Sequence, residues 1–178
     1  TLISVNKNIK ELLKQLKIFD IKNIIITNKE KFILIKSLLR KKKTNVYNNF
    51  ESIDKIFYKK KIDYVMNAVS GLDGLKPTLK IIKYTNKIAI ANKESIICGW
   101  SLITKELKKN KTKFIPIDSE HYSIYSLLGG IKSEKVEKIY ITASGGPFEN
   151  YSLNKFKTIK LRSALHHPNW KMGKKITI

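Results

Sequence analysis

Short apolar runs alternate with longer amphipathic stretches along the chain. Runs of four or five residues rich in Ile and Val are followed by stretches in which apolar residues recur with a helical period. This alternation is typical of βαβ units over a parallel sheet, so we expect an α/β fold. It predicts strands at residues 2–5, 23–27, 64–69, 87–91, 113–117 and 138–142. Helices are predicted at residues 9–16, 29–39, 53–59, 75–83, 97–109, 119–128 and 153–159.

The composition of the chain changes near Ile117, after which glycine, histidine and tryptophan residues gather. We therefore place a domain boundary there, with one domain at residues 1–117 and a second at residues 118–178. No apolar run approaches the roughly 20 residues of a membrane helix, so we expect no membrane partner. The single cysteine, Cys98, excludes a disulfide framework within these residues.

The chain is strongly basic, with 36 Lys and Arg against 14 Asp and Glu and a formal net charge of +22. Such a charge favours a nucleic-acid or anionic-membrane partner. Only Arg40 and Arg162 are arginines, however, and arginine is the residue that reads bases bidentately. The 34 Lys, 28 Ile and 14 Asn are typical of an AT-rich coding sequence. A basic nucleic-acid-binding module remains the alternative, but no RNA-binding signature is present and we expect no specific nucleic-acid partner.

Polar residues follow two of the predicted strands, where ligands bind in open α/β sheets. The first segment is Ala91-Asn92-Lys93-Glu94-Ser95, and its lysine and glutamate could serve a cofactor and a substrate. It could equally be a helix-capping turn with Ser95 as the cap. The second segment is Ile117-Asp118-Ser119-Glu120-His121. Its Asp118 and Glu120 could converge on one divalent cation, because residues i and i+2 of an extended segment point the same way. Asp118 or Ser119 could instead cap the next helix.

Two further segments contain small or aromatic residues. Residues 142–148 run from a predicted strand into a loop of small residues whose amides and hydroxyls could approach a phosphate, although a plain turn has the same pattern. Residues 166–173 bring together two histidines, a tryptophan and a glycine, as in loops that close over substrates.

Taken together and in this order, four segments closely resemble the 1-deoxy-D-xylulose 5-phosphate reductoisomerase family. They are Ala91-Asn92-Lys93-Glu94-Ser95, Pro116-Ile117-Asp118-Ser119-Glu120-His121, Thr142-Ala143-Ser144-Gly145-Gly146-Pro147-Phe148 and His167-Pro168-Asn169-Trp170-Lys171-Met172-Gly173-Lys174-Lys175-Ile176. The resemblance covers nearly all 178 residues and is weakest between residues 20 and 61.

This resemblance implies an enzyme that rearranges 1-deoxy-D-xylulose 5-phosphate and reduces the product with NADPH. The product is 2-C-methyl-D-erythritol 4-phosphate, on the non-mevalonate route to isoprenoids. A divalent metal is also implied, either Mg²⁺, Mn²⁺ or Co²⁺. By similarity Asp118 and Glu120 hold this metal, which polarises the substrate oxygens as a Lewis acid.

The resemblance also implies the other site residues. The catalytic set is Lys93, Asp118, Glu120 and His167. Contacts with the substrate come from Lys93, Ser119, Glu120, Ser144, His167 and the lid residue Trp170. Contacts with NADPH come from Asn92, Glu94 and Gly173.

The N-terminal strand supports NADP as the cofactor. An NAD-binding sheet usually has Asp or Glu at the end of its second strand, where the carboxylate binds the ribose hydroxyls. In this chain the N-terminal strand takes the place of that second strand, and it is followed by Asn6, Lys7 and Asn8. A lysine at this place suits the 2′-phosphate of NADP. We therefore predict cofactor contacts for these three residues. The family pattern has a glycine where this chain has Asn6.

The chain also departs from the family pattern. The family has a glycine-rich Gly-x-Thr-Gly-Ser-x-Gly turn and a segment with a third metal carboxylate, and both are absent from these residues. We therefore expect an internal fragment that is inactive alone. It would contain an N-terminally truncated, Rossmann-like NADPH domain lacking its first strand, followed by the start of an α/β catalytic domain. The resemblance implies a homodimer in the full-length enzyme, in the bacterial cytoplasm or in a plastid if the source is eukaryotic.

Overall fold

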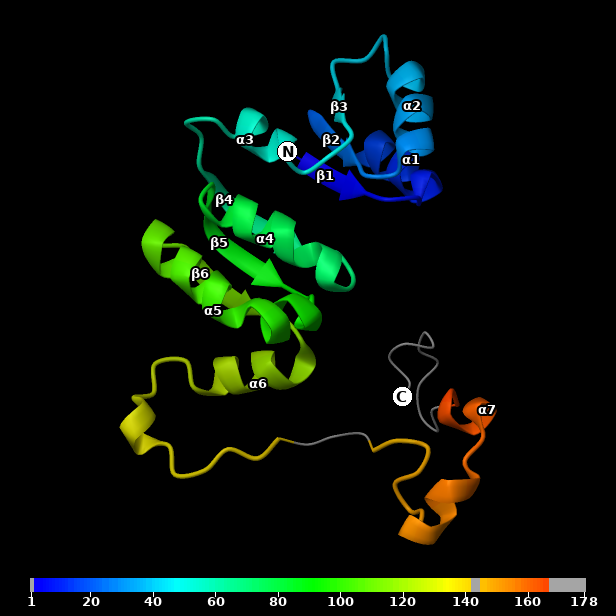
Figure 1. The fold of residues 1–178 in the computed structure, drawn as a ribbon. Coiled ribbons are helices and arrows are strands. Elements are labelled where there is room, and N and C mark those ends of the chain that lie inside the picture. Colours follow the sequence, from blue (N-terminus) through cyan, green and yellow to red (C-terminus); the bar gives the residue numbers. More distant parts are fainter. Residues whose placement is uncertain (1, 142–144, 167–178) are drawn as a thin grey trace. The chain divides into compact units, whose positions relative to one another are not determined.

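The computed structural model describes residues 2–141 and 145–166. The chain divides into two compact units, Thr1–Tyr122 and Ser123–Ile178. The first unit contains strands alternating with helices (Figure 1). Its elements are β1 (Leu2–Val5), α1 (Ile9–Ile18), β2 (Asn23–Ile26), α2 (Lys29–Leu38), β3 (Asn45–Tyr47), α3 (Ser52–Ile56), β4 (Ile62–Asn67), the 3₁₀ turn η1 (Leu72–Gly74), α4 (Leu75–Ile82), β5 (Thr85–Ile90), α5 (Lys93–Asn110) and β6 (Lys113–Pro116).

The second unit contains short helices in its described part. Helix α6 (Ser119–Leu127) begins in the first unit and ends in the second. It is followed by η2 (Ser133–Lys135), η3 (Leu153–Thr158) and α7 (Leu161–Ala164). Within the described ranges, no helix combines the length and the apolar character needed to cross a membrane.

The strands of the first unit form two parallel sheets, with strand orders β1-β2-β3 and β4-β5-β6. Every strand pair is parallel, and β5 pairs with both β4 and β6. The α/β prediction and five of the six predicted strands are therefore confirmed. Strand β3 was not predicted, because three residues are too few to show an apolar pattern.

The predicted strand at residues 138–142 is wrong over its described part. Residues 138–141 have no regular secondary structure, and the side chains of Ile139, Tyr140 and Ile141 are exposed. A strand needs a neighbour that satisfies its backbone N–H and C=O groups, and this segment pairs with no strand in the described part of the chain. The helix predicted at residues 153–159 forms instead as the 3₁₀ helix η3.

Asparagine residues start three of the helices directly after strands. The side-chain oxygens of Asn8, Asn28 and Asn92 each accept a hydrogen bond from the backbone N–H three residues later, at 3.2, 3.0 and 2.6 Å. Each cap satisfies a donor that the start of a helix leaves free. Because Asn92 is the cap of α5, the helix begins at Lys93 rather than at residue 97, and Ser95 is not its cap.

Buried hydrophobic residues form two clusters in the first unit. The first cluster packs α1 and α2 against the first sheet and contains Leu12, Ile21, Ile24, Ile26, Ile35 and Leu39. The second cluster contains Ile25, Ile53, Phe57, Ile81, Ile82, Ile88, Ile90, Ile103 and Leu107. Since Ile25 belongs to the first sheet and Ile88 to the second, this cluster joins the two sheets in one core.

Charged residues link α3 to α4. The Asp54 carboxylate accepts hydrogen bonds from Lys80 at 2.6 Å and from the Tyr84 hydroxyl at 3.0 Å, and lies 2.7 Å from the Lys83 ammonium. The hydrogen bond from Lys80, followed by that from Lys83, lowers the pKa of Asp54 well below its ordinary value. These contacts connect the segment after the first sheet to a helix of the second.

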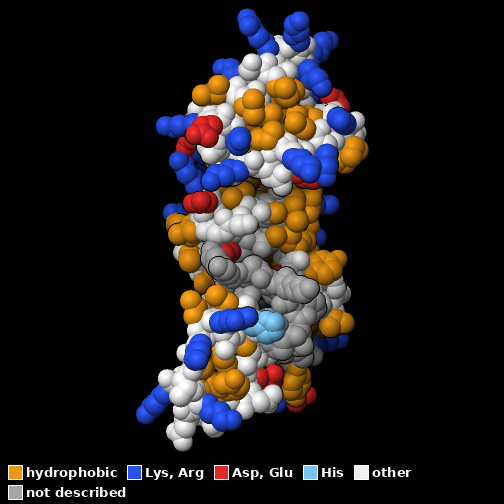
Figure 2. All heavy atoms as spheres, turned by 90° about the vertical axis from the view of Figure 1, so that its right-hand side faces the viewer, with side chains coloured by type: hydrophobic (Ala, Val, Ile, Leu, Met, Phe, Trp, Pro, Cys, Tyr) orange, Lys and Arg blue, Asp and Glu red, His pale blue; other side chains and the backbone are white. Residues whose placement is uncertain are grey.

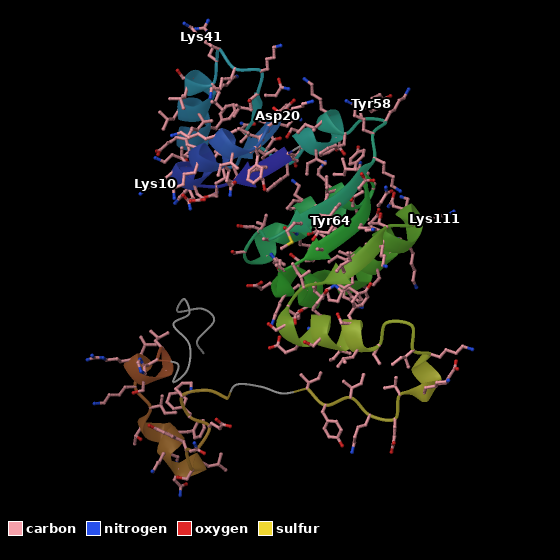
Figure 3. All side chains as sticks on the ribbon, turned by 180° about the vertical axis from the view of Figure 1, so that it is seen from behind. Lys10, Asp20, Lys41, Tyr58, Tyr64 and Lys111 are labelled. Carbon is pink, nitrogen blue, oxygen red and sulfur yellow. The ribbon has the colours of Figure 1, made fainter. Side chains whose placement is uncertain are left out.

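Lysine side chains are spread over the surface. In Figure 2 the Lys and Arg side chains of one face are interspersed with hydrophobic and acidic ones. Lys10, Lys41 and Lys111 lie exposed on three separate segments of the first unit (Figure 3). On these surfaces the positive charge is therefore dispersed.

Ile88→Ala is expected to destabilise the chain strongly. Ile88 is 0% exposed in the shared core, and truncating such a side chain costs about 2–5 kcal/mol because it leaves a cavity. Denaturant unfolding followed by circular dichroism measures the free energy of unfolding. The control is Ile97→Ala on α5, where the side chain is 79% exposed, and it should change that free energy by less than about 0.5 kcal/mol. Equal losses for the two variants would contradict the assigned core.

Asp54→Asn is expected to lower the melting temperature near neutral pH but not in acid. Because the folded-state pKa of Asp54 is lowered, its ionised form stabilises the fold above the unfolded-state pKa of about 4. That contribution is lost as the pH falls through the lowered pKa, so the melting temperatures of the two proteins should converge. Asp63→Asn is the control, since the Asp63 carboxylate accepts a hydrogen bond from the neutral Asn86 side chain. A difference for Asp54→Asn that persists undiminished in acid would refute the prediction.

Candidate functional site

The carboxyl ends of β5 and β6 lie side by side because these strands pair in parallel. Ile90 is paired with Pro116 at this edge of the second sheet. Strand β5 leads through Asn92 into α5, and β6 leads through Asp118 into α6. Ligands bind at this edge in open α/β sheets. Two of the polar segments identified in the sequence therefore begin at neighbouring strand ends.

Three of the predicted site residues meet at this edge. The Lys93 ammonium lies 3.6 Å from Glu120 Oε2 and 3.9 Å from Asp118 Oδ1. The Lys93 and Glu120 side chains are 56% and 43% exposed, whereas the Asp118 side chain is only 10% exposed. The structure thus brings two carboxylates and one cation, taken from separate segments of the sequence, within ion-pair distance.

Asp118 is held at the start of α6 by His121. Its Oδ1 accepts a hydrogen bond from the His121 backbone N–H at 3.2 Å, and it lies 2.6 Å from Nδ1 of the His121 ring. Burial opposes ionisation, but the hydrogen bonds with His121 and the charge of Lys93 outweigh it and lower the pKa of Asp118. Asp118 is therefore ionised at neutral pH. The capping role that the sequence left open occurs, and it places the carboxylate beside Lys93.

The donor set suits a hard divalent cation. Asp118 and Glu120 already converge on one positive charge, the ammonium of Lys93. Carboxylate oxygens are the ligands that Mg²⁺ and Mn²⁺ prefer. Within residues 2–141 and 145–166, no group of three His, Cys, Asp or Glu side chains is placed to hold a metal. The described part of the chain therefore offers two carboxylate ligands.

A second group of predicted residues lies at the carboxyl end of β1. Asn6 and Lys7 line an open hollow of about 620 Å³ together with residues 27–31. The Asn6 side chain donates a hydrogen bond to Thr27 Oγ1 at 2.7 Å, which connects the ends of β1 and β2. Three lysines and one glutamate belong to this lining, so the hollow is net positive, which suits a phosphate.

The other described site residues belong to the same segments. Asn8 caps α1, and Asn92 is buried as the cap of α5. Glu94 lies in the first turn of α5, and Ser119 is the first residue of α6. The remaining predicted site residues, Ser144, His167, Trp170 and Gly173, lie outside the described residues.

Two features of the site were not assigned from the sequence. One is the contact of the His121 ring with Asp118, which depends on the turn at the start of α6. The other is the wall of the hollow formed by residues 27–31. The second could have been found, because Thr27 and Asn28 directly follow an apolar strand, as the predicted ligand-binding residues do.

Comparison with known families shows to which family the chain belongs. Residues 1–99 match the family described as 1-deoxy-D-xylulose 5-phosphate reductoisomerase, and residues 114–178 match the family described as the C-terminal domain of that enzyme. The chain belongs to the 1-deoxy-D-xylulose 5-phosphate reductoisomerase family. The resemblance seen in the four sequence segments is thereby confirmed.

Relatives in this reductoisomerase family match nearly the whole chain. The 1-deoxy-D-xylulose 5-phosphate reductoisomerase of Pelagibacter ubique is 62% identical over 178 residues, which are 99% of this chain and 46% of that protein. The enzyme of the same name from Clostridium tetani is 39% identical over 98% of this chain and 46% of its own length. The chain thus spans about half the length of these relatives.

Solved reductoisomerase structures share the fold. The enzyme from Zymomonas mobilis in complex with NADPH aligns with a TM-score of 0.84 at 29% identity, over 94% of this chain and 44% of that one. A second reductoisomerase, in complex with NADPH, fosmidomycin and magnesium, aligns with a TM-score of 0.79 at 27% identity, over 99% of this chain and 46% of that one. The predicted Rossmann-like α/β class is therefore confirmed.

Mn²⁺ is expected to bind this reductoisomerase-family chain beside Asp118 and Glu120. Because Mn²⁺ is paramagnetic, the backbone amide signals of residues 93–95 and 118–121 should broaden first in an NMR titration. Asp118→Asn should weaken the effect, since it removes one carboxylate charge. The matched control is Asp54→Asn, which removes a carboxylate already paired with lysines and should leave the broadening unchanged. Broadening centred on Asp54, or equal broadening in Asp118→Asn, would contradict the metal assignment.

Proposed function

We propose that this chain is part of an enzyme that converts 1-deoxy-D-xylulose 5-phosphate to 2-C-methyl-D-erythritol 4-phosphate, with NADPH as reductant, in the non-mevalonate isoprenoid pathway. The observation that carries the proposal is the convergence of Lys93, Asp118 and Glu120 at one sheet edge, in a chain of the reductoisomerase family. A carboxylate pair facing an exposed ammonium suits a substrate with neighbouring oxygens and a bound cation.

Each of these side chains has a separate role in the proposed reaction. When bound, NADPH supplies the hydride and a divalent cation supplies Lewis acidity at the substrate oxygens. Asp118 and Glu120 would hold the cation, and the lowered pKa of Asp118 keeps that carboxylate ionised. The exposed Lys93 ammonium would donate hydrogen bonds to substrate oxygens. Ser119, exposed at the start of α6, would add a hydroxyl contact.

The hollow beside β1 is proposed to receive the adenosine end of NADPH. Lys7 provides an ammonium group for the 2′-phosphate, and Asn6 is already fixed by its bond to Thr27. Further contacts with the cofactor are proposed for Asn8, Asn92, Glu94 and Gly173. Substrate contacts are proposed for Ser144, His167 and Trp170, with His167 in the catalytic set.

We also propose a domain boundary near Ile117 and a homodimeric assembly. A boundary near Ile117 is supported by the C-terminal family match, which begins at residue 114, although the first compact unit of the structure ends later, at Tyr122. We propose a homodimer for the full-length enzyme, which light scattering would test. No specific nucleic-acid partner is proposed, because only Arg40 and Arg162 are arginines and arginine is the residue that reads bases bidentately.

A chimera tests the proposed activity. The matching segment of the Pelagibacter ubique reductoisomerase is replaced by these 178 residues, which are 62% identical to it. The chimera should oxidise NADPH in the presence of 1-deoxy-D-xylulose 5-phosphate and Mg²⁺, as followed by the loss of NADPH absorbance. The 178-residue chain alone is expected to show no turnover, because it spans about half of the relatives. A folded but inactive chimera would refute the proposed function.

In this chimera Asp118→Asn is expected to lower turnover on the order of 100-fold or more, because it removes charge that holds the cation at the reacting oxygens. NADPH affinity, measured by fluorescence, should persist. Asp63→Asn is the matched control, since Asp63 is an exposed carboxylate on β4. Loss of NADPH binding with turnover retained at saturating Mg²⁺ would make Asp118 a structural cap only.

A further inference from the structure

A buried hydrogen-bond network lies where β4 and β5 end, next to Lys93. Asn67, the last residue of β4, is 6% exposed, and Asn92, just after β5, is 3% exposed. Asn67 accepts a hydrogen bond from the Val69 backbone N–H at 3.1 Å and donates to the Gly74 carbonyl at 3.2 Å and to the Thr78 hydroxyl. The loop between β4 and α4 is therefore tied to the end of the sheet.

The Asn92 amide ties the same loop to α5. Its Nδ2 donates to the carbonyl oxygens of Val69 and Gly71, the latter at 2.5 Å, and its Oδ1 accepts from the Ser95 backbone N–H at 2.6 Å. An amide nitrogen carries two hydrogens, so both donors of this buried side chain are in use. A contact with NADPH at this position would therefore come from the main chain rather than from the amide.

Two glycines shape the loop around this amide. Gly71 has a φ of 73°, a left-handed conformation that favours glycine, and its carbonyl accepts from Asn92. At Gly74 an added Cβ would collide with the Asn92 amide and with the Val69 carbonyl. The loop thus leaves room for one amide and supplies it with two acceptors.

We infer that Asn92 is a positioning residue, whose buried amide clamps the loop at residues 69–74 to the first turn of α5 and so sets the position of Lys93. Lys93 directly follows Asn92, and its ammonium lies within 4 Å of both Asp118 and Glu120. Fixing the start of α5 therefore fixes the backbone from which the Lys93 side chain reaches these carboxylates. Small displacements of a positioned group reduce rates strongly. The catalytic consequence rests on the proposed function, whereas the clamp itself does not.

Two substitutions break the clamp in different ways. Asn92→Asp keeps the size and the capping oxygen but replaces two donors by an acceptor that faces two carbonyls. Gly74→Ala leaves residue 92 unchanged and crowds its amide. The matched control is Asn45→Asp, the same exchange at an exposed residue whose Nδ2 makes a 3.4 Å hydrogen bond to Asn23.

The first measurement is kinetic and uses the active chimera well below its melting temperature. Asn92→Asp and Gly74→Ala should both lower kcat/KM for the substrate on the order of ten- to a hundred-fold, while the Kd for NADPH stays nearly unchanged. Asn45→Asp should behave like the parent.

If Asn92→Asp weakened NADPH binding and Gly74→Ala did not, the amide would be a direct cofactor contact. If both variants only melted at lower temperature and kept normal kinetics, the network would be purely structural. Either result overturns the inference.

The second measurement does not depend on the proposed function. In NMR spectra of the 178-residue chain, both clamp variants should shift the amide signals of Lys93 and Glu94. They should also shift those of Asp118 and Glu120, because a displaced ammonium changes its ion pairs with these carboxylates. The control should shift neither set. If the shifts stopped at Ser95 and did not reach residues 118–120, Asn92 would not position Lys93. An inactive parent chimera would refute the proposed function alone.

Discussion

The parallel pairing of β5 with β6 is the constraint on which the candidate site depends. Parallel strands place their carboxyl ends at one edge, and the pairing of Ile90 with Pro116 brings two polar segments to neighbouring positions there. The core shared by the two sheets stabilises this arrangement, because Ile88 and Ile90 of β5 are buried there together with residues of α4 and α5. Without this pairing, the segments that carry Lys93 and the two carboxylates would not lie side by side.

Asp118 combines a structural and a chemical role in one carboxylate. A helix cap holds the side chain in place, and the contact with the His121 ring and the charge of Lys93 favour its ionised form. A fixed and ionised carboxylate is what a cation site requires. The alternatives of cap and ligand, which compete when the sequence is considered alone, are therefore compatible in the structure.

Most of the positive charge of the chain lies outside the site formed by Lys93, Asp118 and Glu120. Acidic residues number 14 against 36 basic ones, yet two of the 14 lie within 4 Å of Lys93. Lys10, Lys41 and Lys111 are exposed on separate segments, where each is solvated and makes a small contribution to stability. The few carboxylates therefore indicate the position of the site better than the many lysines do.

The sequence alone determined the α/β class, five strands and the segments that carry Lys93, Asp118 and Glu120, because apolar periodicity and polar strand ends depend only on residues close together in the chain. The segment at residues 138–141 has the same local pattern but forms no strand, since a strand also needs a partner from elsewhere. Only the tertiary structure decided that Asn92 is a buried clamp rather than an exposed amide. Its two acceptors, the carbonyls of Val69 and Gly71, are brought to it by the pairing of β4 with β5, and no local pattern contains that information.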